Sequence, residues 1–173
     1  IEKVDEDFLY DIEITTNRID LMSVVGLARE SAAVLTEKGI SAKFIPVKTE
    51  VINNKTKLDI EIKNDPRLVN RICAVLLEFD LKPSPEYIQK RLIAAGINPH
   101  NNVIDVTNYV MREMGHPMHA FDYDTLEGGR IVVRAAKEGE KILALDGNEY
   151  ELASSNLVIA DSARPVAIAG VMG

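Results

Sequence analysis

The N-terminal part of the chain shows two hydrophobic periods in succession. Residues 11–15 alternate polar and apolar side chains, which is the two-residue period of a half-exposed strand. Over residues 23–38 the apolar side chains recur at helical spacing instead. Ser23 or Asp20 can cap the start of this helix, and Gly39 suits a left-handed residue at its end. The pattern therefore predicts a strand, a turn and a helix.

A second patterned region begins only after an irregular stretch. Residues 41–57 are rich in lysine and polar side chains, include Pro46 and keep no sustained period, so we expect them to connect two domains. Beyond them, residues 58–62 and 71–79 are predicted to be strands, separated by turn residues at positions 64–66.

The next predicted helix begins near Ser84 and Pro85. Serine is a favourable N-cap and proline is favoured at the first helical position, so this pair is typical of a helix start. Gly96 is expected to end the helix.

A further helix with one apolar face follows. Its apolar residues are spaced three, four and four apart: Val103, Val106, Val110 and Met114. Asn102 is a plausible N-cap, and Gly115 lies past the end. Thr107 and Asn108 then fall in the middle of the helix, where polar β-branched and amide side chains are not favoured for helix formation.

The C-terminal third reads as short strands. The predicted strands are residues 130–135, 141–145, 149–152, 157–160 and 166–169. Asp146-Gly147-Asn148 lies between the second and third of them and is the strongest short-range hairpin signal in the chain.

Composition limits the functional classes. With 46% apolar residues in 173, the chain can bury a core, so it is not a disordered tail. Its 27 acidic and 20 basic residues give a net charge of −7, so any RNA contact must be local or supplied by another chain. No apolar run approaches the roughly 20 residues of a membrane span, and no signal peptide is present, so we expect a cytoplasmic protein. The absence of an initial methionine and the small, apolar last residues suggest a fragment of a longer chain.

Familiar catalytic and metal-binding signatures are absent from the sequence. It contains no phosphate-binding glycine loop, no nucleophile elbow and no His-Glu-x-x-His motif. His116 and His119 flank Pro117, but they lack the cysteines or the second histidine pair of a zinc site, so no metal is expected. Their structural interpretation is a solvated His116 and a hydrogen-bonded, half-buried His119. Cys73 lies in an apolar run and is expected to be buried and inert.

Three sets of motifs carry a resemblance that covers nearly the whole chain. Residues 101–110 read NNVIDVTNYV and residues 115–122 read GHPMHAFD, which closely resembles the editing-domain signature of bacterial phenylalanyl-tRNA synthetase β subunits. EITTNRID at 13–20 with GLARE at 26–30 is similar to the same family. So are the C-terminal motifs, LDG at 145–147, VIAD at 158–161 and AGVMG at 169–173.

The resemblance implies a hydrolytic editing function. An apolar pocket rejects tyrosine in favour of phenylalanine by only about a hundredfold, so a second site must cleave tyrosine from the tRNA. Carried over by motif, Thr107 and His119 would hold the ester and the attacking water, as the catalytic candidates. The substrate-binding candidates would be Asn108, Pro117, Ala169 and Gly170. Small Ala169 leaves room for an aromatic ring, and Gly170 allows close approach of the backbone.

The same resemblance implies a domain plan and partners. We expect an α+β fold in which residues 1–40 form the C-terminal part of a discontinuous N-terminal domain, 41–57 a linker, and 58–173 the N-terminal part of a mixed, β-rich editing domain with helices outside. The synthetic site, with ATP and Mg²⁺, would belong to the α subunit of a heterotetramer, and this fragment would need no cofactor. The expected ligands are tRNA(Phe) and its tyrosine or phenylalanine ester.

Two other interpretations remain open. The chain could be a free-standing relative that edits in trans, or a noncatalytic scaffold or RNA-contact module. In the noncatalytic case Thr107 would simply bond to a carbonyl one turn earlier, and the Ala169-Gly170 segment would be a strand with a tight turn.

Overall fold

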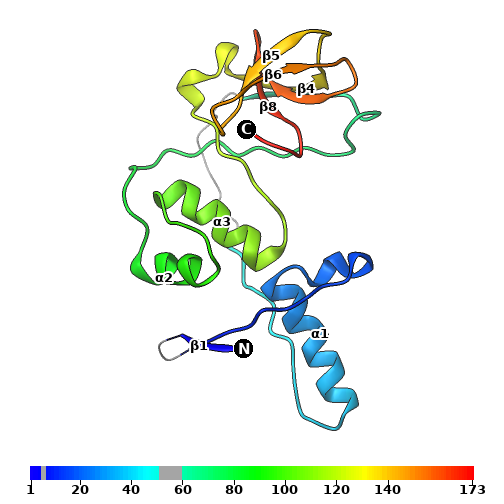
Figure 1. Cartoon of the computed structure of the whole chain (residues 1–173), viewed down its shortest axis with the longest axis vertical. Coiled ribbons are helices and arrows are strands. Elements are labelled where there is room, and N and C mark those ends of the chain that lie inside the picture. Colours follow the sequence, from blue (N-terminus) through cyan, green and yellow to red (C-terminus); the bar gives the residue numbers. More distant parts are fainter. Residues whose placement is uncertain (5–6, 51–59) are drawn as a thin grey trace. The chain divides into compact units, whose positions relative to one another are not determined.

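The computed structural model describes residues 1–4, 7–50 and 60–173, and the chain divides into two compact units. The first unit comprises Ile1–Ile52 and Phe79–Ala120, and the second comprises Asn53–Glu78 and Phe121–Gly173. Figure 1 follows the chain through both. Of the predicted linker, residues 51–57 lie outside the described part. The two units are described separately below.

The first unit opens with a hairpin and a helix. Its elements are β1 (Glu2–Val4), antiparallel β2 (Asp7–Leu9), the 3-10 helix η1 (Thr16–Leu21) and α1 (Val24–Glu37). The strand predicted at residues 11–15 is wrong, because this stretch forms no ladder with any described strand. The predicted helix is confirmed, with Ser23 Oγ accepting from Gly26 N–H at 3.0 Å and Gly39 at φ 78° after its end.

Two further helices pack against each other in the first unit, α2 (Glu86–Ala94) and α3 (Asn102–Met114) (Figure 1). Pro85, not Ser84, occupies the N-cap position of α2, because the Ser84 hydroxyl is engaged elsewhere. Asn101, not Asn102, caps α3, since its side chain accepts from two N–H groups of the first turn. The predicted ends of both helices are confirmed, because Gly96 and Gly115 adopt positive φ just after them.

The second unit is built on a four-stranded sheet. Its strands, in spatial order, are β3 (Glu61–Asn64), β4 (Arg130–Ala135), β7 (Leu157–Ala160) and β8 (Pro165–Ile168). The β3–β4 pair is parallel, and the other pairs are antiparallel. The short 3-10 helices η2 (Tyr123–Thr125) and η3 (Glu127–Gly129) precede β4. The predicted first strand, 58–62, is therefore placed later, at 61–64, and its residues 58 and 59 are outside the described part.

A separate hairpin completes the second unit and its core. β5 (Glu140–Leu143) pairs with antiparallel β6 (Glu149–Leu152) across the Asp146-Gly147 turn, which confirms the predicted hairpin. Alternate residues of the hairpin and sheet face one apolar cluster, which Ile168 also contacts: Ala136, Ile142, Leu152, Val158 and Ala160.

The predicted strand at residues 71–79 is wrong. These residues form no ladder with any described strand, although half-buried Ile72 and Leu76 alternate with exposed residues such as Val75 and Leu77. Alternation alone therefore did not produce a strand, because a strand also needs a neighbour that satisfies its backbone groups. Cys73 lies on the outward side of this segment and is exposed, which corrects the expectation of a buried thiol.

The α+β fold class is confirmed, with helices, a mixed four-stranded sheet and a small strand–helix piece at the N-terminus. The compact units cut the chain differently from the predicted domains, since Phe79–Ala120 groups with the N-terminal segment. The boundaries at 1–40, 41–57 and 58–173 stay a prediction.

Candidate functional site

The predicted site residues are divided between the two units. Thr107 and Asn108 lie on α3, and Pro117 and His119 lie in the loop after it, all in the first unit. Ala169 and Gly170 follow β8 in the second unit. The structure therefore brings four of them together on one helix and loop, and the remaining two in one turn.

Thr107 is half-buried, and its hydroxyl donates to the carbonyl oxygen of Ile104 at 2.8 Å. This is the back-bond that the structural interpretation of Thr107 anticipated. The bond uses the hydroxyl proton, so the oxygen can still accept a hydrogen bond from a water or another donor. Asn108, the next residue on α3, is half-buried as well.

The loop after α3 begins with a sharp left-handed turn. Gly115 has φ 79°, and a Cβ atom at this position would lie 3.1 Å from Ser23 Cβ, so glycine is required by conformation and space together. His116 and Pro117 are exposed, as expected for a loop. His119 is exposed too, which corrects the half-buried position expected for it, yet partial desolvation of its ring lowers the pKa of the imidazole below its ordinary value of 6.5. His119 is therefore mainly neutral at pH 7 and able to accept a proton.

Ala169 and Gly170 form a tight turn after β8. Val171 N–H donates to the Ile168 carbonyl at 3.0 Å, and Gly170 has φ 72°. Ala169 is half-buried, whereas Gly170 is exposed and a Cβ on it would meet no described atom within 4 Å. Glycine is thus needed here for the left-handed backbone, and the space at its Cβ position is open.

A buried carboxylate shapes the loop that leads into β8. Asp161 is 4% exposed and accepts hydrogen bonds from the N–H groups of Glu127, Ala163 and Arg164 at 2.8 to 3.1 Å. Burial alone would raise the pKa of this carboxyl, but the three N–H donors hold it below its ordinary value. Asp161 therefore remains ionised and fixes the loop that leads into β8.

Sequence reasoning missed a second buried carboxylate, Asp105, on the helix that carries Thr107. Asp105 is 1% exposed and accepts from the Ser84 hydroxyl at 2.5 Å and from the His100 N–H at 2.7 Å. An aspartate in the first turn of a helix is common at the surface, because it favours the helix dipole, so the sequence held no signal that this one is buried.

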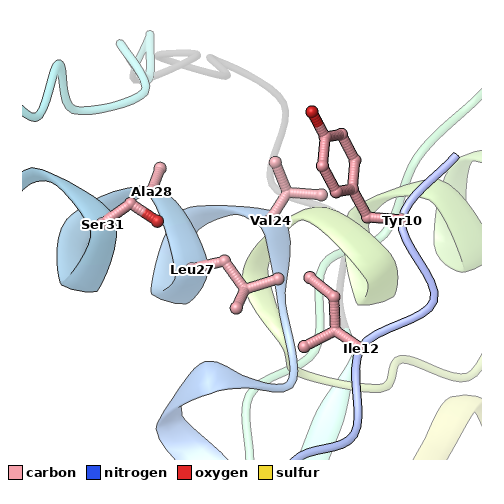
Figure 2. A pocket seen from close by; sticks show the side chains of 6 residues that line it. All are labelled: Tyr10, Ile12, Val24, Leu27, Ala28 and Ser31. Atoms are coloured by element: carbon pink, nitrogen blue, oxygen red, sulfur yellow. The ribbon is translucent and has the colours of Figure 1, made fainter. Parts of the chain in front are cut away.

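An open apolar hollow lies elsewhere in the first unit (Figure 2). Tyr10 and Ile12 from the extended segment face α1 side chains across it: Val24, Leu27, Ala28 and Ser31. None of these residues is charged, and none belongs to the predicted site. The hollow offers apolar contact but no acid, base or nucleophile other than neutral hydroxyls.

Metal ligands and membrane spans were searched among the described residues. No group of three or more histidine, cysteine, aspartate or glutamate side chains in residues 1–4, 7–50 and 60–173 could hold a metal ion. Within the same ranges, no helix has the length and apolar content that crossing a membrane requires.

Comparison with known families places this fold and these motifs in a defined class. Residues 69–173 match the B3/4 domain family, and the chain belongs to that family. The match lies inside the region predicted at 58–173 and contains α3, the loop after it and the turn after β8.

The chain is, in addition, homologous over its whole length to phenylalanine–tRNA ligase beta subunits. It is 46% identical over 176 residues to that of Carboxydothermus hydrogenoformans, covering 100% of this chain and 22% of the relative. The corresponding values are 48%, 97% and 21% for Moorella thermoacetica, and 43%, 97% and 21% for Streptococcus pneumoniae. The resemblance stated from the motifs is confirmed. The chain spans about a fifth of the length of these relatives.

Proposed function

We propose that the chain is a segment of a phenylalanine–tRNA ligase β subunit, and that it contributes to hydrolysis of tyrosine wrongly attached to tRNA(Phe). The observation that carries the proposal is the identity of 46% across the entire chain to such a subunit, together with the B3/4 domain match. The preference for tyrosine over phenylalanine has a chemical reason. Phenylalanine lacks the tyrosine hydroxyl, so a polar group that binds this hydroxyl is left unpaired when phenylalanine occupies the site.

The residues of α3 and of the loop after it have groups that could bind the attacking water and accept its proton during hydrolysis of the ester. The Thr107 hydroxyl already donates its hydrogen bond to the Ile104 carbonyl, so its oxygen would accept a hydrogen bond from the attacking water. His119, mainly neutral at pH 7, would take up the proton that this water releases. The water oxygen would bond to the ester carbon, the bond from this carbon to the tRNA ribose oxygen would break, and the protonated His119 would return its proton to the leaving ribose oxygen.

The remaining candidates would bind the aminoacyl group. We assign Asn108 and Pro117 to contacts with the substrate, and we assign Ala169 and Gly170 to accommodation of the aromatic ring because neither carries a bulky side chain. Support for the last assignment comes from the turn geometry, since Gly170 at φ 72° exposes its peptide groups without a Cβ in the way.

The activity of the whole enzyme would require partners. We propose an α subunit that carries the synthetic site with ATP and Mg²⁺, assembled with the β subunit in a cytoplasmic heterotetramer. The described residues offer no group that fits a metal ion, so no step assigned to this chain passes through Mg²⁺ or the nucleotide. A net charge of −7 agrees with tRNA contacts that are local or made mainly by other parts of the enzyme.

Deacylation of tyrosyl-tRNA(Phe) by the αβ enzyme that contains this segment tests the proposal. The wild type should release tyrosine much faster than it releases phenylalanine from Phe-tRNA(Phe). Thr107→Val and Ala169→Val should each slow the release of tyrosine at least tenfold, and phenylalanine charging should stay unchanged. A double-mutant cycle should give a coupling free energy above about 0.5 kcal/mol if the two residues act on one ligand. Wild-type rates for both single variants would refute the site.

A noncatalytic module is the second candidate. The bond from Thr107 to Ile104 favours it, because this bond gives the hydroxyl a complete structural explanation. In that case Thr107→Val would lower the stability of α3 and leave the deacylation rate unchanged.

A further inference from the structure

We propose that the first turn of α3 is a positioning device, in which Asn102 and Asp105 fasten the helix to residues 80–84 and thereby set the orientation of Thr107. The inference rests on the proposed function, because its principal test is the hydrolysis of tyrosyl-tRNA(Phe). It divides the motif at residues 101–110 into an anchoring part and a part that faces the substrate.

Asn102 makes the first half of the attachment. Its backbone N–H donates to the Lys82 carbonyl at 2.8 Å, and its side-chain oxygen accepts from the Lys82 N–H at 3.1 Å. Its amide nitrogen donates to the Asp80 carbonyl at 2.9 Å. Asn102 therefore holds residues 80–82 much as a neighbouring strand would, and α3 cannot slide along its axis without breaking these bonds.

Asp105 makes the second half, one turn further along. Its two carboxylate oxygens accept from the Ser84 hydroxyl and the His100 N–H, and the side chain is 1% exposed. Ser84 is buried too, at 5%. Ser84 precedes Pro85, the N-cap residue of α2, so this bond ties the start of α2 to α3 and opposes rotation of α3 about its axis.

Helix stability alone does not explain these two side chains. Asn101 already caps α3 by accepting from the N–H groups of Val103 and Ile104 at 3.0 Å. A buried carboxylate is costly to desolvate, and an apolar residue of similar volume often stabilises a protein at least as well. What Asp105 adds, and an apolar residue would not, is a directional bond that permits a single rotation of the helix.

The geometry of a helix connects this rotation to Thr107. At 3.6 residues per turn, Thr107 projects from roughly the opposite side of α3 to Asp105. Side chains reach about 5 Å from the axis, so a rotation of about 20° would move the Thr107 oxygen by nearly 2 Å. A displacement of about 1 Å at a reacting group can slow catalysis roughly a hundredfold. Asp105 acts through Thr107 and is a positioning residue.

Three variants of the αβ enzyme test this role: Ser84→Ala, Asp105→Leu and Asp105→Asn. Ser84→Ala and Asp105→Leu should each lower kcat for tyrosyl-tRNA(Phe) hydrolysis about tenfold or more, with KM changed less than twofold. Asp105→Asn should retain most of kcat, because its amide oxygen can still accept from His100 and its nitrogen can donate to the Ser84 oxygen. Phenylalanine charging should be unchanged in all three, which checks that the enzyme is assembled.

The outcomes separate the two proposals. If the wild type hydrolyses tyrosyl-tRNA(Phe) and Ser84→Ala keeps the wild-type kcat, the positioning role is wrong. The same holds if Asp105→Asn loses as much kcat as Asp105→Leu. If the wild type shows no hydrolysis, the proposed function fails, and hydrogen exchange of the amides at residues 106–114 decides the positioning role. Faster exchange in Ser84→Ala and not in Asp105→Asn would support it, whereas equal exchange in both would overturn it.

Discussion

Gly26 in α1 packs so closely on Asp20 that a Cβ atom on Gly26 would lie 2.0 Å from the Asp20 carbonyl oxygen. The two elements in contact, η1 and α1, are also joined by Arg18, which donates to Glu30 on α1 at 2.9 Å. Both contacts depend on motifs at residues 13–20 and 26–30 that the sequence singled out. Withdrawal of the η1 backbone from Gly26 would strain the bonds from Arg18 to Glu30.

We therefore expect Gly26→Ala to destabilise the chain, although alanine is the better helix former by about 1 kcal/mol. Overpacking against a fixed carbonyl should cost about 1–3 kcal/mol, measured as the change in the free energy of unfolding in urea. Ser31→Ala, at an exposed position of the same helix, serves as the control and should change stability by less than about 0.5 kcal/mol. If Gly26→Ala is as stable as the wild type, η1 moves away from the added Cβ without a measurable cost, and the prediction is wrong.

The ion pair of Arg134 and Glu140 predicts a dependence of stability on pH. Two bonds of 2.7 and 2.8 Å join the side chains, and hydrogen bonding to Arg134 lowers the pKa of Glu140 from 4.5 to about 2. Because the folded pKa is the lower one, the pair's stabilisation is complete above about pH 4.5 and is lost as the pH falls towards about 2. Glu140→Gln should remove this part of the pH dependence and cost about 1–2 kcal/mol at pH 7.

Urea unfolding of the wild type and Glu140→Gln between pH 2 and 7 measures the effect. The two stability curves should converge at the acid end, where Glu140 becomes protonated. Curves that stay parallel over the whole range would mean that the ion pair contributes nothing. Glu149→Gln is a suitable control, because its bond to Lys141 is exposed and screened by solvent, so it should contribute little to stability.

Asp161→Asn should disturb the loop before β8 selectively. The asparagine oxygen can still accept from the N–H groups of Ala163 and Arg164, but its NH₂ group would face the Glu127 N–H that the carboxylate now binds. Two donors in contact leave a buried group without a partner, which costs about 1–3 kcal/mol. Thermal unfolding should therefore show a lower Tm, and hydrogen exchange should increase most at Glu127. Protection of the Glu127 amide as in the wild type would contradict this account.

Elements with local signals were predicted well from the sequence. The helix capped by Ser23, the hairpin at Asp146-Gly147 and the strand at 157–160 all match the structure, because capping, turn conformation and a short apolar run act between near neighbours in the chain. The strands predicted at residues 11–15 and 71–79 failed for the opposite reason. A strand exists through its partner, and no pattern within such a segment shows whether a partner is available.

For the candidate site, too, the sequence revealed local motifs but not contacts between residues far apart in the chain. Motif resemblance identified the residues around Thr107 and the family to which the chain belongs, and the comparisons confirmed the family. It did not single out Asp105, whose burial depends on Ser84, a residue 21 positions away. Such a contact arises from the packing of α2 on α3 and leaves no periodic trace in the sequence.

The pH dependence of tyrosyl-tRNA(Phe) hydrolysis tests the role proposed for His119. Desolvation lowers the pKa of this imidazole below 6.5, so the neutral, proton-accepting form persists to more acidic pH than in an ordinary histidine. If His119 is the general base, the rate should be constant near pH 7 and fall only below an apparent pKa that is less than 6.5. Single-turnover rates between pH 5 and 8 measure this, because binding and product release are then separated from chemistry.

His119→Asn should abolish the acid limb and lower the plateau by about 10²–10⁴-fold, which is the usual contribution of a general base. His116→Asn, at the exposed histidine three residues earlier, should keep both the limb and the plateau. A limb that survives in His119→Asn would assign the titration to another group, and the attacking water would then be held by Thr107 and activated by some residue other than His119.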